Sequence, residues 1–122
     1  MIDHIQINVS SFDRSCRFYA KALAPLGYKT KYNDPKSKTA GFGAGDSIDL
    51  WITEKAAVTR VHIAMRSPDR AAVDQFHANP LAAGGRDNGA AGLRPDYSLP
   101  YYAAFVLDPD GNNLELVCHE AG

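Results

Sequence analysis

The 122-residue chain has no apolar run that approaches the roughly 20 residues needed for a membrane-spanning helix. Its first residues also lack the basic region followed by an apolar region that marks a secretory signal. The only cysteines are Cys16 and Cys118, and both lie in apolar patterns, which predicts buried thiols and no disulfide framework. These absences predict a cytoplasmic protein that does not enter a membrane.

An excess of positive charge is missing as well, since the formal net charge is -1. The densest group of basic residues, from Lys29 to Lys38, is interrupted by Asp34 and Pro35 and is typical of a solvated strand edge and loop. We therefore expect no nucleic-acid partner. Because 45% of the residues are hydrophobic, the chain can bury one core, which predicts a single domain over residues 1–122.

The first half of the chain has the pattern of a strand, a helix and three further strands. Polar and apolar residues alternate over residues 3–9, as in a strand with one buried face. A helical pattern follows, which either Ser10 or Ser11 can cap and which Gly27 ends. The three further strands are predicted over residues 28–32, 39–43 and 47–53.

The same order begins again with an alternating strand over residues 60–66. We interpret Ser67, Pro68 and Asp69 as the N-cap, first-turn proline and first-turn acid of a second helix. Pro80 should kink or break this helix, with a last short turn starting at Asn79.

After the second helix, the Gly- and Pro-punctuated stretch from Arg86 to Pro100 is expected to hide at least one strand. Strands over residues 101–107 and 112–119 then flank a tight turn, Asp108-Pro-Asp-Gly111. The chain is therefore interpreted as one strand-helix-three-strand unit that occurs twice, over residues of about 1–55 and 60–119.

Strand alternation also assigns the candidate ligands to one face of the sheets. His4, His62 and Glu115 each alternate with apolar neighbours, so all three should lie on the face away from the helices. A lone strand histidine is most often a surface residue. Two histidines and one carboxylate on rigid strands, however, form a set that binds a divalent ion and leaves positions open for substrate.

Asp49 has the same parity as these ligands, and Asp49-Leu50 in the first unit matches Glu115-Leu116 in the second. The repeat therefore supplies one histidine and one carboxylate per unit. Because Asp is one methylene shorter than Glu, Asp49 could instead hydrogen-bond to a ligand without touching the ion.

In four motifs the chain resembles the glyoxalase/bleomycin resistance/extradiol dioxygenase superfamily, also called the vicinal oxygen chelate superfamily. The motifs are Asp3-His-Ile5, Asp13-Arg-Ser-Cys-Arg-Phe-Tyr19, Val61-His-Ile-Ala64 and Asp108-Pro-Asp-Gly-Asn-Asn-Leu-Glu115. The resemblance implies an α+β fold in which two βαβββ modules form a cupped mixed sheet around a metal. It also implies a homodimer that completes the fold or the site, with ligands carried over to His4, Asp49, His62 and Glu115.

The chain departs from this family pattern at three positions. Asp49 stands where glyoxalase I has Glu, while extradiol dioxygenases use two His and one Glu, which leaves the reaction class open. Asn8 lies near the place of an arginine that binds a glutathione carboxylate in bacterial glyoxalase I, and this argues against lactoylglutathione lyase activity. Similar small proteins favour Tyr-His where this chain has Tyr97-Ser98, so a pocket donor is missing.

We expect a metal-dependent enzyme of the lyase or isomerase type, in which a Zn, Ni, Co, Mn or Fe ion binds two adjacent oxygens of a small substrate. Glu115, or Asp49 if the metal releases it, would move the proton. Two alternatives stay open: a bleomycin-resistance-like binding protein without catalysis, and an extradiol-type Fe(II) dioxygenase. The residues expected to contact the substrate, the last three from a covering loop, are Trp51, Arg94, Tyr97 and Tyr101.

Overall fold

The computed structural model describes residues 1–98 and 100–121, with the side chain of Ala82 excepted. The first module consists of β1 (Ile5–Val9), α1 (Phe12–Ala22), the short 3-10 helix η1 (Ala24–Leu26), β2 (Lys29–Asp34), β3 (Thr39–Gly43) and β4 (Leu50–Glu54). The second consists of β5 (His62–Arg66), α2 (Arg70–Ala82), β6 (Arg86–Leu93), β7 (Tyr102–Leu107) and β8 (Asn113–Cys118). Two βαβββ modules are therefore present, and the predicted α+β fold class is confirmed.

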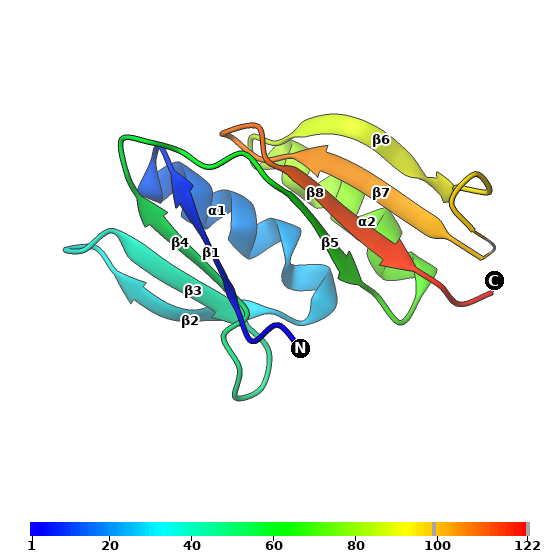
Figure 1. Ribbon diagram of the computed structural model, residues 1–122, viewed down its shortest axis with the longest axis horizontal. Coiled ribbons are helices and arrows are strands. Elements are labelled where there is room, and N and C mark those ends of the chain that lie inside the picture. The colour runs from blue at the N-terminus through cyan, green and yellow to red at the C-terminus, as the bar shows by residue number, and fades with distance from the viewer. Residues whose placement is uncertain (99, 122) are drawn as a thin grey trace.

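Each module forms a four-stranded mixed sheet, in the order β1-β4-β3-β2 in the first and β5-β8-β7-β6 in the second. The first strand of each module pairs in parallel with the last, and the other pairs are antiparallel. Both helices lie on the same side of the two sheets and contact each other (Figure 1). In this arrangement β1 and β5 face each other across the middle of the molecule, where Ile5 and Ile63 line a common cavity, and the opposite sheet face carries no helix.

The core lies between the sheets and the helices. Alternate strand residues such as Ile7 and Ile52 point to this side and are fully buried against α1, which contributes Phe18 and Tyr19. Burying each such side chain stabilises the fold by about 1.5–3 kcal/mol. Because the core takes one face of each strand, polar side chains of the other parity are left on the helix-free face.

Helix α1 is shorter than predicted. Ser11 is its N-cap, and the Ser11 hydroxyl accepts a hydrogen bond from the amide of Arg14 at 3.4 Å. The helix ends at Ala22, not at Gly27, and a 3-10 turn that contains Pro25 follows. Proline has no N–H to continue the α-helical hydrogen bonds, which accounts for the early end.

The predicted N-cap of α2 was wrong, and of the kink or break predicted at Pro80 the break does not occur. Asp69, not Ser67, is the N-cap, and its carboxylate accepts a hydrogen bond from the amide of Ala72 at 2.8 Å. The helix does not break at Pro80 but continues to Ala82. Pro80 lies in the last turn, where its missing N–H removes one of the final hydrogen bonds only.

The strand predicted between residues 86 and 100 is confirmed as β6, which is paired with β7 and bulged near Gly89. Leu99, in the same stretch, lies outside the described residues. Other strands start one to three residues later than predicted, among them β1 at Ile5 and β4 at Leu50. His4 and Asp49 consequently lie just before their strands.

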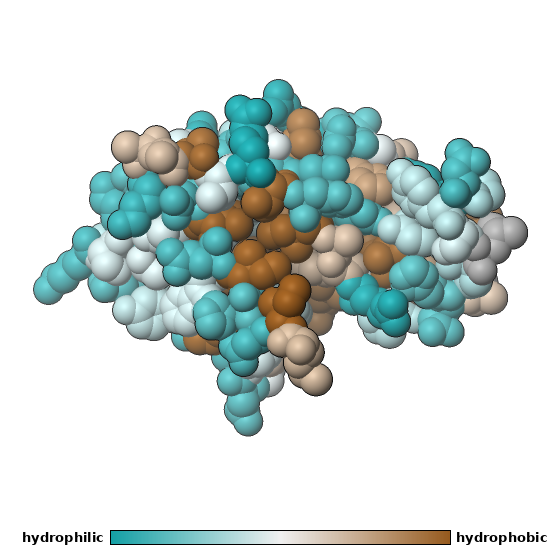
Figure 2. Space-filling view, in the orientation of Figure 1, coloured by the Kyte–Doolittle hydropathy of each residue, from teal (hydrophilic) through white to brown (hydrophobic). Residues whose placement is uncertain are grey.

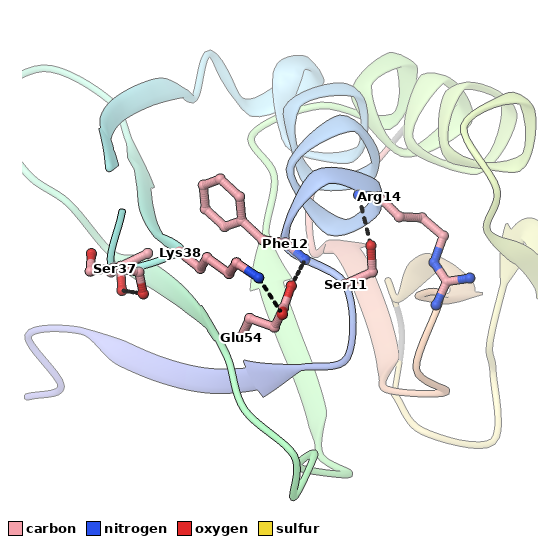
Figure 3. Close-up of polar contacts among 7 residues, drawn as sticks. Ser11, Phe12, Arg14, Ser37, Lys38 and Glu54 are labelled. Atoms are coloured by element: carbon pink, nitrogen blue, oxygen red, sulfur yellow. Dashed lines mark hydrogen bonds and ion pairs between the residues drawn. The ribbon is translucent and has the colours of Figure 1, made fainter. Parts of the chain in front are cut away.

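Helix α1 is fastened to the end of β4 through one carboxylate, as Figure 3 shows. Glu54 accepts hydrogen bonds from the amide of Phe12 at 2.8 Å and from the ammonium of Lys38 at 3.0 Å. These two donors hold the pKa of Glu54 below its usual value, with the Phe12 amide as the larger cause. A group whose pKa is lower in the folded protein stabilises the fold above its unfolded pKa of about 4.3 and stops doing so as the pH falls through the folded value.

We therefore expect Glu54→Gln to lower the melting temperature at pH 7 by on the order of a few degrees. The difference from wild type should shrink as the pH falls below about 4, because wild-type Glu54 is then protonated as well. Thermal unfolding followed by circular dichroism from pH 7 to pH 3 measures this. Lys38→Met, which removes the weaker partner, should have a smaller effect. An equal difference at all pH values would contradict the role of the Glu54 charge.

Candidate functional site

His4 and Asp49 lie next to each other at the entrance to the paired strands β1 and β4. Ile5 is opposite Leu50 in the register, and the amide of Ile5 donates to the carbonyl oxygen of Asp49 at 2.9 Å. The side chain of His4 is half exposed, and its Nδ1 lies 2.7 Å from the carboxylate of Asp3. His4 and Asp49 both line a cavity of about 300 Å³ at the seam between the modules.

A tyrosine that the sequence patterns did not single out holds Asp49. The hydroxyl of Tyr28 donates a hydrogen bond to Oδ2 of Asp49. Burial first, and then this bond and the carboxylate charge, raise the pKa of Tyr28 to about 12, so the hydroxyl keeps its proton at neutral pH. In the sequence, the only signal for Tyr28 is its place directly after Gly27. In the structure Gly27 has a φ of 78° and forms the turn before β2.

His62 and Glu115 are the second histidine and carboxylate of the predicted ligand set, and they touch. His62 is opposite Asn113 and Ala64 is opposite Glu115, so the two side chains are diagonal neighbours on one face. Nε2 of His62 lies 2.9 Å from Oε1 of Glu115. The side chain of Glu115 is only 3% exposed, whereas that of His62 is half exposed.

Tyr101, predicted to contact substrate, donates a hydrogen bond to Oε2 of Glu115. Burial and this contact raise the pKa of Tyr101 to about 12, so it too remains a donor at neutral pH. The ring of Tyr97 meets Tyr101 edge-on with the centroids 5.0 Å apart, and His119 meets it with the centroids 5.2 Å apart. Tyr97, Tyr101 and His119 therefore belong to the His62–Glu115 half of the site.

Arg94 and Trp51, the other residues predicted to contact substrate, have different surroundings. The guanidinium of Arg94 donates to the carbonyl oxygens of Ala90 and Gly92 at 2.7 and 2.9 Å, and it lies over the ring of Phe105. Arg94 thus binds the bulged backbone of β6, and its contact with substrate stays a prediction. Trp51 lines a second cavity, of about 410 Å³, together with His4.

The four predicted ligands form two pairs and do not form one cluster. Across residues 1–98 and 100–121, no three His, Cys, Asp or Glu side chains are placed to hold a metal ion. In the first module His4 and Asp49 line one cavity, and in the second His62 contacts Glu115. The complete four-residue ligand set therefore stays a prediction.

The sequence model of the Glyoxalase/Bleomycin resistance protein/Dioxygenase superfamily matches residues 1–116. The chain belongs to this superfamily. The search of curated proteins found no match to this chain. None of its described helices is long and apolar enough to cross a membrane.

Solved structures share the fold of this glyoxalase-superfamily chain at low sequence identity. A glyoxalase/bleomycin resistance protein from Albidiferax ferrireducens has a TM-score of 0.83 at 24% identity, covering 98% of this chain and 99% of that one. A glyoxalase-related enzyme from Fulvimarina pelagi has a TM-score of 0.73 at 20% identity, covering 97% and 87%. A glyoxalase I variant from Zea mays has a TM-score of 0.71 at 24% identity, with 95% of this chain but 46% of the maize chain covered.

Proposed function

We propose that this protein is a metal-dependent enzyme of the lyase or isomerase type that acts on a small substrate with two adjacent oxygens. The observation that carries the proposal is the His62–Glu115 pair, in which an imidazole nitrogen and a buried carboxylate oxygen lie 2.9 Å apart on the helix-free face. His4 and Asp49 offer the same donor types in the first module. Two nitrogens and two oxygens suit Zn, Ni, Co, Mn or Fe.

We further propose that a second copy of the chain brings the two pairs together. The edge strands β1 and β5 each have one free side, because among the described residues β1 pairs only with β4 and β5 only with β8. Apolar side chains gather along the seam between them, as Figure 2 shows. Ile2 and Val61 are exposed, and Ile5 and Met65 are only partly buried.

A homodimer that covers this seam would hide the apolar surface and the free edges together. In such a dimer His4 and Asp49 of one protomer would share an ion with His62 and Glu115 of its partner. This arrangement accounts for the separation of the two pairs within one chain.

Within this site each residue has a distinct task. A bound divalent ion would orient the two substrate oxygens and stabilise the negative charge that develops on them. Glu115, or Asp49 where the ion does not hold it, would take the proton from the substrate carbon and return it. Tyr101 and Tyr28 keep one oxygen of each carboxylate fixed, since both hydroxyls are protonated at neutral pH.

The direct test is the metal content of protein purified without a histidine tag. We expect about one divalent ion per chain by elemental analysis, and its loss in His4→Ala and in Glu115→Ala. The matched control is His77→Ala, which removes a histidine that bonds to Asp87 away from the site. Wild-type protein that stays empty, and whose thermal stability no divalent ion raises, would contradict the enzyme and favour a binding protein without catalysis.

Removing the hydroxyl that holds Glu115 should weaken metal binding without abolishing it. Tyr101→Phe leaves Oε2 of Glu115 without its donor, and loss of such an outer partner typically lowers metal affinity about 10- to 100-fold. Competition with a fluorescent chelator measures the change. Tyr97→Phe, which keeps the edge-on ring contact, should leave the affinity unchanged. Equal affinities for wild type and Tyr101→Phe would show that Tyr101 does not position the carboxylate.

A further inference from the structure

Trp51 is part of an aromatic row on the helix-free face of the first sheet. Tyr32 and Trp51 are both opposite Gly41 in the register, so the three residues lie across β2, β3 and β4. A side chain on Gly41 would place its Cβ 3.1 Å from the Cε3 and Cζ3 atoms of the indole. The absence of that side chain lets the six-membered ring of Trp51 lie over β3.

Tyr32 supports the indole, and a cavity opens next to it. The Tyr32 and Trp51 rings have centroids 5.4 Å apart with a tilt of 59°. The cavity beside Trp51 measures about 410 Å³, and its other walls are the Asp46–Ile48 segment and the pair Asp3 and His4. His4 also lines the cavity of about 300 Å³ that contains Asp49. The two cavities are therefore neighbours that share Asp3 and His4 as walls.

Core packing does not account for this tryptophan. The core of the first sheet lies on the opposite face, where Phe42, Leu50 and Ile52 are buried. Trp51 is only partly buried, and it is the single tryptophan of the chain. A large, fixed aromatic surface that borders a cavity is typical of a ligand-binding site.

The charges of the cavity restrict the ligand further. The carboxylates of Asp3 and Asp46 belong to its wall, and that of Asp3 lies 2.7 Å from Nδ1 of His4. Next to Asp46, the ammonium of Lys31 donates to the carbonyl oxygen of Gly45 at 2.6 Å. A planar cation is attracted both by the ring face and by these carboxylates, whereas a carboxylate on the ligand is repelled by them.

We propose that Trp51 and the Asp46–Ile48 segment bind a planar aromatic group of the substrate that is uncharged or positively charged at its outer end. This inference rests on the proposed function, because it places the rest of the substrate at His4 and Asp49. It names an aromatic, non-anionic compound as the substrate class.

Three small probes with the same ring test this proposal: benzylammonium, benzyl alcohol and benzoate. Because the chain has one tryptophan, a saturable change in indole emission reports binding at this place. We expect benzylammonium and benzyl alcohol to produce it, with benzoate at least about 10-fold weaker. Asp46→Asn should reduce the preference for benzylammonium over benzoate several-fold and leave benzyl alcohol unchanged.

Trp51→Leu should weaken the two favoured probes about 10-fold or more in ligand-observed NMR, which does not depend on the indole. Trp51→Phe keeps a smaller aromatic ring, so its affinity for the probes should lie between those of wild type and Trp51→Leu. This variant keeps the test valid if Trp51→Leu does not fold. Metal content is measured in parallel. If Trp51→Leu loses probe binding but keeps its metal, the loss is due to the aromatic subsite. If the wild-type protein contains no metal, the result contradicts the proposed function and not the subsite. Benzoate binding as tightly as benzylammonium, or probe binding unaffected in Trp51→Leu, would overturn the inference.

Discussion

Combining a His4→Ala chain with a His62→Ala chain is expected to restore metal binding that neither variant has alone. Each variant dimer has a damaged ligand pair in both of its sites. In a mixed dimer both substitutions fall in one site, and the other site takes His4 and Asp49 from one protomer and His62 and Glu115 from its partner. Mixed dimers should therefore hold about half of the wild-type metal, since one of the two symmetric sites is intact.

The measurement uses co-expressed chains with two different affinity tags that lack histidine, so that sequential purification isolates mixed dimers. Elemental analysis then gives the metal per dimer. The matched control combines His62→Ala with Glu115→Ala, two substitutions in the same pair, which should leave both sites empty. No metal in the first mixed dimer would show that each site belongs to a single chain, or that the chain forms no site, and either result contradicts the shared site.

Replacing Asp108 by Ala is expected to cause the largest loss of stability. Asp108 is 1% exposed, and its carboxylate accepts four hydrogen bonds, from the Tyr19 hydroxyl, the Asp110 amide, and the backbone and side-chain nitrogens of Asn112. The Tyr19 bond, at 2.5 Å, fastens the β7–β8 turn to helix α1 of the other module. Buried donors left without an acceptor, together with the lost charge-assisted bonds, should lower the free energy of unfolding by about 3–5 kcal/mol.

Urea unfolding followed by circular dichroism measures this loss. Tyr19→Phe removes a single one of the four donors and should cost about 1–2 kcal/mol, which also keeps the prediction testable if Asp108→Ala does not fold. Asp110→Ala is the matched control on the same turn, since it removes only a bond from the exposed amide of Ser10. If Asp108→Ala lowers the free energy of unfolding by less than about 1 kcal/mol, the turn does not hold the modules together.

Local pattern was sufficient for most of the fold. Alternation located the strands that carry His62 and Glu115, and β6 was expected within the stretch from Arg86 to Pro100. The errors lie at element ends. The end of α1 and the cap of α2 are set by single hydrogen bonds, such as the one that the Asp69 carboxylate accepts. A hydrophobic pattern is averaged over several residues, so it does not locate a helix end to the residue.

The candidate site was predictable as a set of residue types on one face, but its partners were not. The bond from Tyr28 to Asp49 joins residues 21 positions apart, and the bond from Tyr101 to Glu115 joins residues 14 positions apart. A tyrosine beside a strand has the same local pattern whether its hydroxyl meets water or a carboxylate. Only the pairing of the strands and the turns before them decides which of the two occurs.

The sequence by itself determined the order of elements in the two βαβββ units, and it predicted one common face for His4, Asp49, His62 and Glu115. It could do so because side chains alternate along a strand and one apolar face must be buried, and both effects act between near neighbours. Only the tertiary structure decided that α1 packs on α2, and that among the described residues the two ligand pairs form no common cluster and β1 and β5 each keep one unpaired side. How two modules pack depends on the whole surface that each of them buries, and no local pattern contains that sum.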